Sequence, residues 1–213
     1  MIAYASDNCT ITLCTQEIDS LSPSNHHQEV REEFAKIKLV GVALADYSSI
    51  PAIEGDSACL CVKSSAYVQH TNFLALESPL ICLDCGQTVP LYRISKLFPN
   101  AIQDLIYWQS NYKSCDQLQV SCWALEKQAI NEMSKWSSDL SKQGMGIAKR
   151  ITKATGVPTY YYLYRGSAKS LKSELARKCP KCKRKWRLKK KQQQYDFRCD
   201  KCLLISTLAW NTG

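Results

Sequence analysis

The chain changes from an alternating pattern of apolar and polar positions to a helical one near its start. Apolar and polar side chains alternate over residues 1–14, which predicts a strand. A polar loop follows over residues 15–26. Residues 45–56 are expected to form a loop or an edge strand, and Ala58 to Val62 a short strand. Between these segments a helix is predicted, because apolar side chains recur at helical spacing at Val30, Phe34, Ile37 and Val40.

The strongest helical signal lies in the middle of the chain. Apolar side chains recur at steps of three and four from Leu105 to Trp136, and no glycine or proline interrupts residues 100–143. This pattern predicts one long helix or two stacked helices. A shorter helix is expected over Met145–Thr155, with Gly156 as its left-handed C-cap.

A tyrosine-rich strand is predicted after this helix, over residues 159–165. Tyr160, Tyr162 and Tyr164 fall on one face of the extended segment. Such a row could stack nucleobases. Burial against the helices is the favoured interpretation, because aromatic side chains in strands mostly pack. Residues 166–176 are expected to form a polar linker with one turn of helix.

Two CxxC pairs near the C-terminal end carry the clearest chemistry in the sequence. Sixteen residues separate Cys179 and Cys182 from Cys199 and Cys202. Two pairs at this spacing are typical of one tetrahedral zinc ion. A redox CxxC would need one reactive pair beside a βαβ pattern. The residues between the pairs suffice for two strands, and a third strand is expected after them, so we predict a three-stranded zinc ribbon with one structural Zn²⁺.

A third CxxC, formed by Cys82 and Cys85, is only half of such a site. Cys59, Cys61 and Cys115 are its possible partners. A half motif specifies neither the metal nor the other ligands. The favoured interpretation is therefore that these thiols are buried as small hydrophobes, and a second metal site is the less favoured alternative.

Positive charge is concentrated in the ribbon segment. The net charge is +9, yet residues 177–202 hold 12 Lys or Arg and only 2 Asp or Glu, whereas residues 1–56 hold 3 basic and 9 acidic residues. Four thiolates around Zn²⁺ carry about two negative charges, so the loaded ribbon keeps a surplus of about +8. Such asymmetry favours an anionic partner. The residues expected to contact it are Lys181, Lys183, Arg184, Lys185, Arg187, Lys189, Lys190 and Lys191.

Two hypotheses follow from the basic ribbon. In the first, its cations neutralise phosphates, and Trp186, Tyr195 and Phe197 add base stacking if they are exposed. No recognition helix or RNA-recognition motif is visible, so binding of RNA or DNA should show weak sequence preference. In the alternative, the chain is a protein-interaction module whose basic face docks an acidic surface, such as the acidic residues 1–56 of this chain or of a second copy.

The sequence argues against an enzyme. Its three histidines, His26, His27 and His70, form no H-E-x-x-H motif, and neither a phosphate-binding glycine loop nor G-x-S-x-G is present. A closed site of four cysteines has no open position for a substrate or an activated water. Acids brought together by the fold, such as Asp84 and Asp116, are left open by the sequence.

The expected compartment is the cytoplasm. No apolar run approaches the ~18 residues that a membrane span needs. The first residues lack the basic and apolar regions of a signal peptide. In a reducing compartment the 12 cysteines should remain thiols or metal ligands.

The C-terminal half resembles a bacterial family of zinc-ribbon-containing proteins of unknown function, for which nucleic-acid binding has been suggested. The residues that carry the resemblance are 155–165, the Cys-Pro-Lys-Cys of 179–182, the Trp-Arg-Leu of 186–188, and 197–203 through Trp210, with weaker matches at 82–85 and 115–116. The resemblance implies a cytoplasmic bacterial protein with a C-terminal zinc ribbon. We therefore expect an α+β fold, with an N-terminal α/β layer and long helices over residues 1–165 and the ribbon over residues 166–213.

Overall fold

The structure is a computed structural model, and the residues that it describes are 2–5, 8–11, 17, 19–41, 58–95 and 99–212. The chain divides into two compact units, residues 1–58 and 59–213. The predicted loop or edge strand over 45–56 lies outside the described residues. No described helix combines the length and apolar character that crossing a bilayer requires.

The first unit contains a hairpin and a helix. Strands β1 (Ile2–Ala5) and β2 (Asn8–Ile11) pair antiparallel. The single strand predicted over 1–14 was therefore wrong: two short paired strands give the same alternation as one long strand. The short 3-10 helix η1 (Pro23–Asn25) precedes helix α1 (Gln28–Leu39), which confirms the helix predicted there.

The second unit is built on a mixed sheet of six strands in the order β4-β3-β5-β8-β7-β6. Strand β5 is parallel to both β3 and β8, and the other pairs are antiparallel. The strands are β3 (Tyr67–Gln69), β4 (Leu80–Cys82), β5 (Thr159–Tyr162), β6 (Arg187–Gln192), β7 (Tyr195–Cys199) and β8 (Leu204–Ser206). The α+β class and the three ribbon strands are confirmed. The ribbon strands continue the sheet through the pairing of β8 with β5, and the domain boundary at residue 166 stays a prediction.

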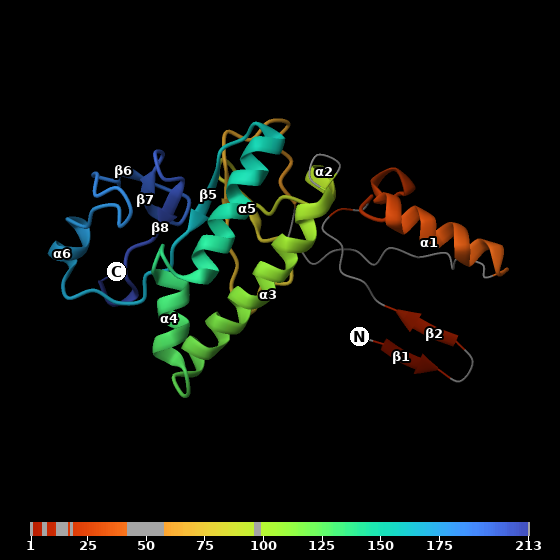
Figure 1. Cartoon of the computed structure of the whole chain (residues 1–213), viewed down its shortest axis with the longest axis horizontal. Coiled ribbons are helices and arrows are strands. Elements are labelled where there is room, and N and C mark those ends of the chain that lie inside the picture. Colours follow the sequence, from red (N-terminus) through yellow and green to blue (C-terminus); the bar gives the residue numbers. More distant parts are fainter. Residues whose placement is uncertain are drawn as a thin grey trace. The chain divides into compact units, whose positions relative to one another are not determined.

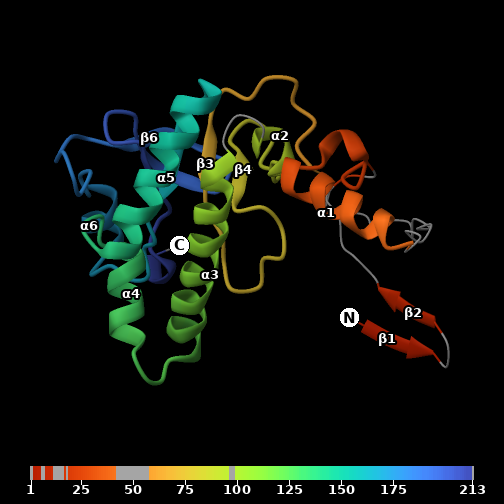
Figure 2. The ribbon, with the colours of Figure 1, turned by 45° about the vertical axis from the view of Figure 1, so that its right-hand side comes forward.

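Helices α3, α4 and α5 lie side by side in Figures 1 and 2, and α5 packs on both α3 and β5. The long helical pattern is therefore two helices followed by a third. The third begins before Met145 because Ser138 caps it, its Oγ accepting the N–H of Ser141 at 3.2 Å. Gly156 ends it at φ 71°, as predicted. The helices of this unit are α2 (Tyr92–Ser95), α3 (Pro99–Ser121), α4 (Glu126–Ser134), α5 (Asp139–Thr155), α6 (Leu171–Leu175) and the 3-10 helix η2 (Trp210–Thr212).

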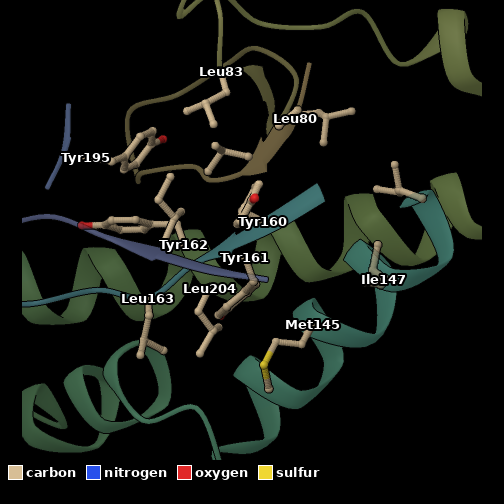
Figure 3. Packing of buried hydrophobic residues seen from close by; sticks show 14 of the residues in the cluster. Leu80, Leu83, Met145, Ile147, Tyr160, Tyr161, Tyr162, Leu163, Tyr195 and Leu204 are labelled. Carbon is tan, nitrogen blue, oxygen red and sulfur yellow. The ribbon is translucent and has the colours of Figure 1, made fainter. Parts of the chain in front are cut away.

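The tyrosine strand β5 is buried on both sides. Tyr161 points toward α5 and Met145, while Tyr162 points to the opposite side of the sheet, where Tyr195 lies (Figure 3). Tyr161 is 0 % exposed, and Tyr160 and Tyr162 are 5 % exposed. Burial of Tyr160 and Tyr162 confirms that the row packs and rules out base stacking by these two rings. The ring that packs against the helices is, however, that of Tyr161, 5.8 Å from the ring of Trp108, so the predicted face was wrong.

Gly144 allows α5 to approach β5. A Cβ at this position would lie 2.2 Å from Cε2 of Tyr161 and 2.6 Å from Nε1 of Trp108. Because both rings are fully buried in a close-packed core, we expect Gly144→Ala to lower the free energy of unfolding by about 2 kcal/mol. Urea denaturation followed by circular dichroism measures this loss.

Gly146 of the same helix provides the matched control. A Cβ there would meet nothing within 4 Å. Gly146→Ala should therefore be neutral or stabilise by up to about 1 kcal/mol, as Ala does in an exposed helix position. Equal losses in the two variants would contradict the steric explanation.

Candidate metal centres

The four cysteines predicted to bind zinc come together at the base of the ribbon strands. The Sγ atoms of Cys179, Cys182, Cys199 and Cys202 all lie within 4.8 Å of one another, and those of Cys182 and Cys199 are 3.5 Å apart. A tetrahedral ion with metal–sulfur bonds of about 2.3 Å needs sulfur separations of about 3.8 Å. This cluster, here called the ribbon centre, therefore fits a metal ion.

The first CxxC of the ribbon centre forms a turn that points both thiols to one place. The N–H of Lys183 donates to the carbonyl of Cys179 at 2.9 Å, and the N–H of Cys179 donates to the carbonyl of Arg184 at 2.9 Å. Lys183 adopts a left-handed φ of 61° to close this turn. In the second pair, Leu203 follows Cys202 with a φ of 51°.

A second four-cysteine cluster, here called the core centre, lies in the part of the chain between α1 and α2. The Sγ atoms of Cys59, Cys61, Cys82 and Cys85 also lie within 4.8 Å of one another. The sequence favoured buried thiols without metal at Cys82 and Cys85. That interpretation is corrected, because Cys85 is exposed and the four cysteines form a group that could hold a metal ion. Cys115 is on α3 and outside the cluster.

The strand predicted from Ala58 to Val62 was also wrong. Residues 58–61 are irregular and bring Cys59 and Cys61 to the turn that follows β4. The N–H of Cys59 donates to the carbonyl of Thr88 at 2.8 Å, which fixes this approach. Twenty residues separate Cys61 from Cys82, within the usual zinc-site window, so only the shorter first pair departs from the pattern. This near-match was the signal that the sequence interpretation missed.

The core centre repeats the turn of the ribbon centre. The N–H of Gly86 donates to the carbonyl of Cys82 at 2.9 Å, and the N–H of Cys82 donates to the carbonyl of Gln87 at 2.8 Å. Gly86 supplies the left-handed φ of 78° after the second cysteine. Two CxxC segments far apart in the chain thus share one backbone design for presenting paired thiols.

The thiols of each cluster do not ionise equally. Burial opposes ionisation of Cys82, but hydrogen bonds from Ser64 and from the backbone N–H groups of Cys85 and Asp84 lower its pKa to about 7. A hydrogen bond to Cys85, with further ones to neighbouring thiols and burial, instead raises the pKa of Cys61 to about 12.

The ribbon centre shows the same contrast. The backbone N–H of Arg184 lowers the pKa of Cys182 to about 6, whereas burial raises that of Cys202 to about 11. Four adjacent thiolates therefore need a cation to balance them, which is what a bound metal supplies.

All eight basic residues predicted to contact an anion are exposed. Within the described parts of the chain, none of them forms an ion pair with a carboxylate. Two other arginines of the basic segment are neutralised internally: Arg177 pairs with Glu174 at 3.0 Å and Arg198 pairs with Asp200 at 2.9 Å. The exposed set is Lys181, Lys183, Arg184, Lys185, Arg187, Lys189, Lys190 and Lys191.

The three aromatic side chains between the two CxxC pairs of the ribbon are buried, so the stacking role considered for them is ruled out. Trp186, Tyr195 and Phe197 are 2 %, 1 % and 0 % exposed. The rings of Trp186 and Phe197 lie 5.4 Å apart, and the guanidinium of Arg177 covers both. These aromatics are core residues of the sheet that the ribbon strands share with β5.

His70 and Asp116, one of the two acids that the sequence left open, have structural partners. His70 lies 3.8 Å from the ring of Tyr162 and 3.0 Å from Oη of Tyr195, and burial lowers its pKa to about 3. Asp116 accepts the N–H of Phe73 at 2.8 Å, and burial raises its pKa. Their contacts therefore hold the loops after β3 to the rest of the unit.

Comparison with known proteins identifies relatives but no described activity. A family model described as "Domain of unknown function (DUF2310)" matches residues 61–164, and one described as "Domain of unknown function (DUF8594)" matches residues 168–212. One Haemophilus influenzae relative, named "Uncharacterized protein", is 38 % identical over 201 residues, covering 93 % of this chain and 77 % of its own. Another of the same name and organism is 45 % identical over 145 residues, covering 68 % and 71 %. No solved structure matches the chain.

Proposed function

This chain belongs to the bacterial family described as a domain of unknown function (DUF2310), and we propose that it is a two-zinc cytoplasmic protein that binds nucleic acid with weak sequence preference. Both centres offer four soft thiolates within 4.8 Å of one another, the donor set that zinc prefers. Because such sites are closed, the zinc would be structural and the protein would not be an enzyme.

The observation that carries the proposal is the contrast between paired and unpaired cations around the ribbon centre. Arg177 and Arg198 lie against carboxylates, whereas the eight predicted residues are exposed without such partners. Cations held on a metal-stapled scaffold can each neutralise a phosphate and release its counterions. Phosphate contacts position a protein on nucleic acid without reading bases, hence the weak sequence preference.

The proposal predicts a salt-dependent affinity that is lowered by removing charge from the ribbon. The purified protein should bind single- and double-stranded RNA and DNA with a log K that falls linearly with the logarithm of the salt concentration. Replacing Lys189, Lys190 and Lys191 by Gln should reduce the slope by about 2–3, since each lost phosphate contact contributes about 0.7–0.9. Filter binding at several salt concentrations measures both quantities.

The control removes the same charge elsewhere. Lys127, Lys149 and Lys153 are exposed on α4 and α5, so their triple replacement by Gln matches the change in net charge. A smaller effect of this control supports contact through the ribbon. Equal effects of the two triple variants would contradict it.

The alternative is a protein-interaction module whose basic face docks an acidic protein surface. It is favoured by the burial of Trp186, Tyr195 and Phe197, which leaves these rings unable to stack on bases. The titration separates the two functions, because failure to bind any of the four nucleic acids at low salt would support the alternative.

A further inference from the structure

Strands β6 and β7 form a hairpin, here called the basic hairpin, and its tip, residues 193–194, rests on the core centre. Nε2 of Gln193, in the turn between β6 and β7, donates to the carbonyl of Asp84 at 2.8 Å. Asp84 lies between Cys82 and Cys85, two ligands of the core centre. Oε1 of Gln193 would be only 2.9 Å from a Cβ at Gly86, so this glycine leaves room for the contact.

A neighbouring glutamine fastens the same tip to the core. Nε2 of Gln194 lies 3.1 Å from Nδ1 of His70, which follows β3. Gln192, by contrast, bonds within the hairpin, where its Oε1 accepts from Arg198 at 2.7 Å. The tip is thus held by two side chains that reach residues more than a hundred positions earlier in the sequence.

The conformation of Gln193 indicates that its side chain matters. Its φ of 52° lies in the left-handed region, where a two-residue hairpin turn normally prefers Gly, Asn or Asp. A glutamine there costs free energy relative to those residues. Its bond to the carbonyl of Asp84 offsets that cost and accounts for a glutamine at this position.

We propose that the core centre positions the basic hairpin through Gln193, so that metal in this centre raises the affinity of Lys189, Lys190 and Lys191 for phosphate. The affinity part rests on the proposed function. Metal bound to Cys82 and Cys85 fixes the turn that carries the carbonyl of Asp84. A fixed hairpin presents its lysines already ordered, and binding then costs less conformational entropy. Gln193 is a positioning residue in this scheme.

Hydrogen–deuterium exchange of residues 187–198 in the metal-loaded full chain tests the coupling. In Gln193→Asn the side chain is one methylene shorter, and Asn tolerates the left-handed turn. Exchange at the tip should be about fivefold faster, the factor for loss of one hydrogen bond. Gln143→Asn, at an exposed position on α5, should leave it unchanged.

Removing metal from the core centre should have the same effect on the tip. Cys85→Ser should lose one metal by elemental analysis and speed tip exchange at least as much as Gln193→Asn. Adding Gln193→Asn to it should then have little further effect, because both act through one contact. Unchanged exchange at the tip after confirmed metal loss overturns the proposal, and so does unchanged exchange in Gln193→Asn, should Cys85→Ser fail to fold.

Affinity for a short mixed-sequence DNA duplex at low salt provides the second readout. We expect Kd to rise about threefold in Gln193→Asn, within the range for one lost hydrogen bond. Faster exchange with unchanged Kd would show that the core centre does not affect the affinity for phosphate. If the unmodified protein does not bind the duplex, the proposed function fails for this probe and the affinity part fails with it, while the exchange result still decides whether the core centre positions the hairpin.

Discussion

Cys202→Ser is expected to remove one metal ion per chain and to unfold the ribbon strands β6 and β7, while helices α3, α4 and α5 stay folded. In zinc-finger peptides a structural zinc contributes about 10–16 kcal/mol to folding at neutral pH. A whole domain is stable by only about 5–15 kcal/mol. The free energy lost with one of the four ligands is therefore larger than the free energy that packing of the short ribbon strands contributes.

Three measurements check this result. Elemental analysis should show metal falling from two ions per chain to one, and hydrogen exchange should show lost protection over β6 and β7. The far-UV helical signal should persist, although at a lower melting temperature, because β8 pairs with β5 in the core sheet. Cys122→Ser is the control, since this exposed thiol lies outside both clusters. Unchanged metal content would contradict the assignment, and complete loss of helical signal would show that ribbon and helices unfold together.

The ribbon centre was predictable because its chemistry is local. Cys179 to Cys202 form a single segment of the chain, and two CxxC turns at that spacing can reach one ion whatever surrounds them. The helices were predictable in the same sense, because Leu105, Trp108 and Tyr112 are buried at the spacing that the pattern shows.

The core centre was harder to predict because its ligands meet through the tertiary fold. Cys59 and Cys61 lie outside any helix or strand. A backbone hydrogen bond from Cys59 to Thr88 brings this segment close to Cys82. A C-x-C pair is one residue shorter than the expected motif. Cys59, Cys61 and Cys115 therefore remained equally possible partners before the fold was known.

The burial of the ribbon aromatics also depends on distant parts of the chain. The sequence pattern offered Trp186, Tyr195 and Phe197 for stacking if they were exposed, but could not tell whether other parts of the chain cover them. The rings are covered because pairing of β8 with β5 joins the ribbon strands to the core sheet. There the ring of Tyr195 packs 5.9 Å from that of Tyr162, and Arg177 lies over Trp186 and Phe197. Parallel pairing of this kind leaves no local signature, and the same holds for the docking of Gln193 on Asp84.

The second large effect is expected at Glu174, a buried carboxylate of α6 that joins Arg165, just after the tyrosine strand, to Arg177, just before the ribbon centre. Its side chain is 0 % exposed, 2.8 Å from Nη2 of Arg165 and 3.0 Å from Nε of Arg177. Burial lowers the pKa of Arg177 to about 10, so this cation depends on the carboxylate. Glu174→Gln keeps the shape but leaves the cations uncompensated, and we expect it to lower the free energy of unfolding by about 3–5 kcal/mol.

Denaturant unfolding of Glu174→Gln and two companion variants tests this role. Glu33→Gln breaks a pair with Lys36 whose side chains are about two-thirds exposed, and such surface pairs contribute about 0–1 kcal/mol. Adding Arg165→Met to Glu174→Gln should restore part of the lost stability, because it removes one orphaned charge. Metal content should stay at two ions per chain throughout, since the carboxylate touches neither centre. If Glu174→Gln costs no more than Glu33→Gln, the carboxylate does not hold the two segments together, and the contacts of Arg177 with Trp186 and Phe197 suffice.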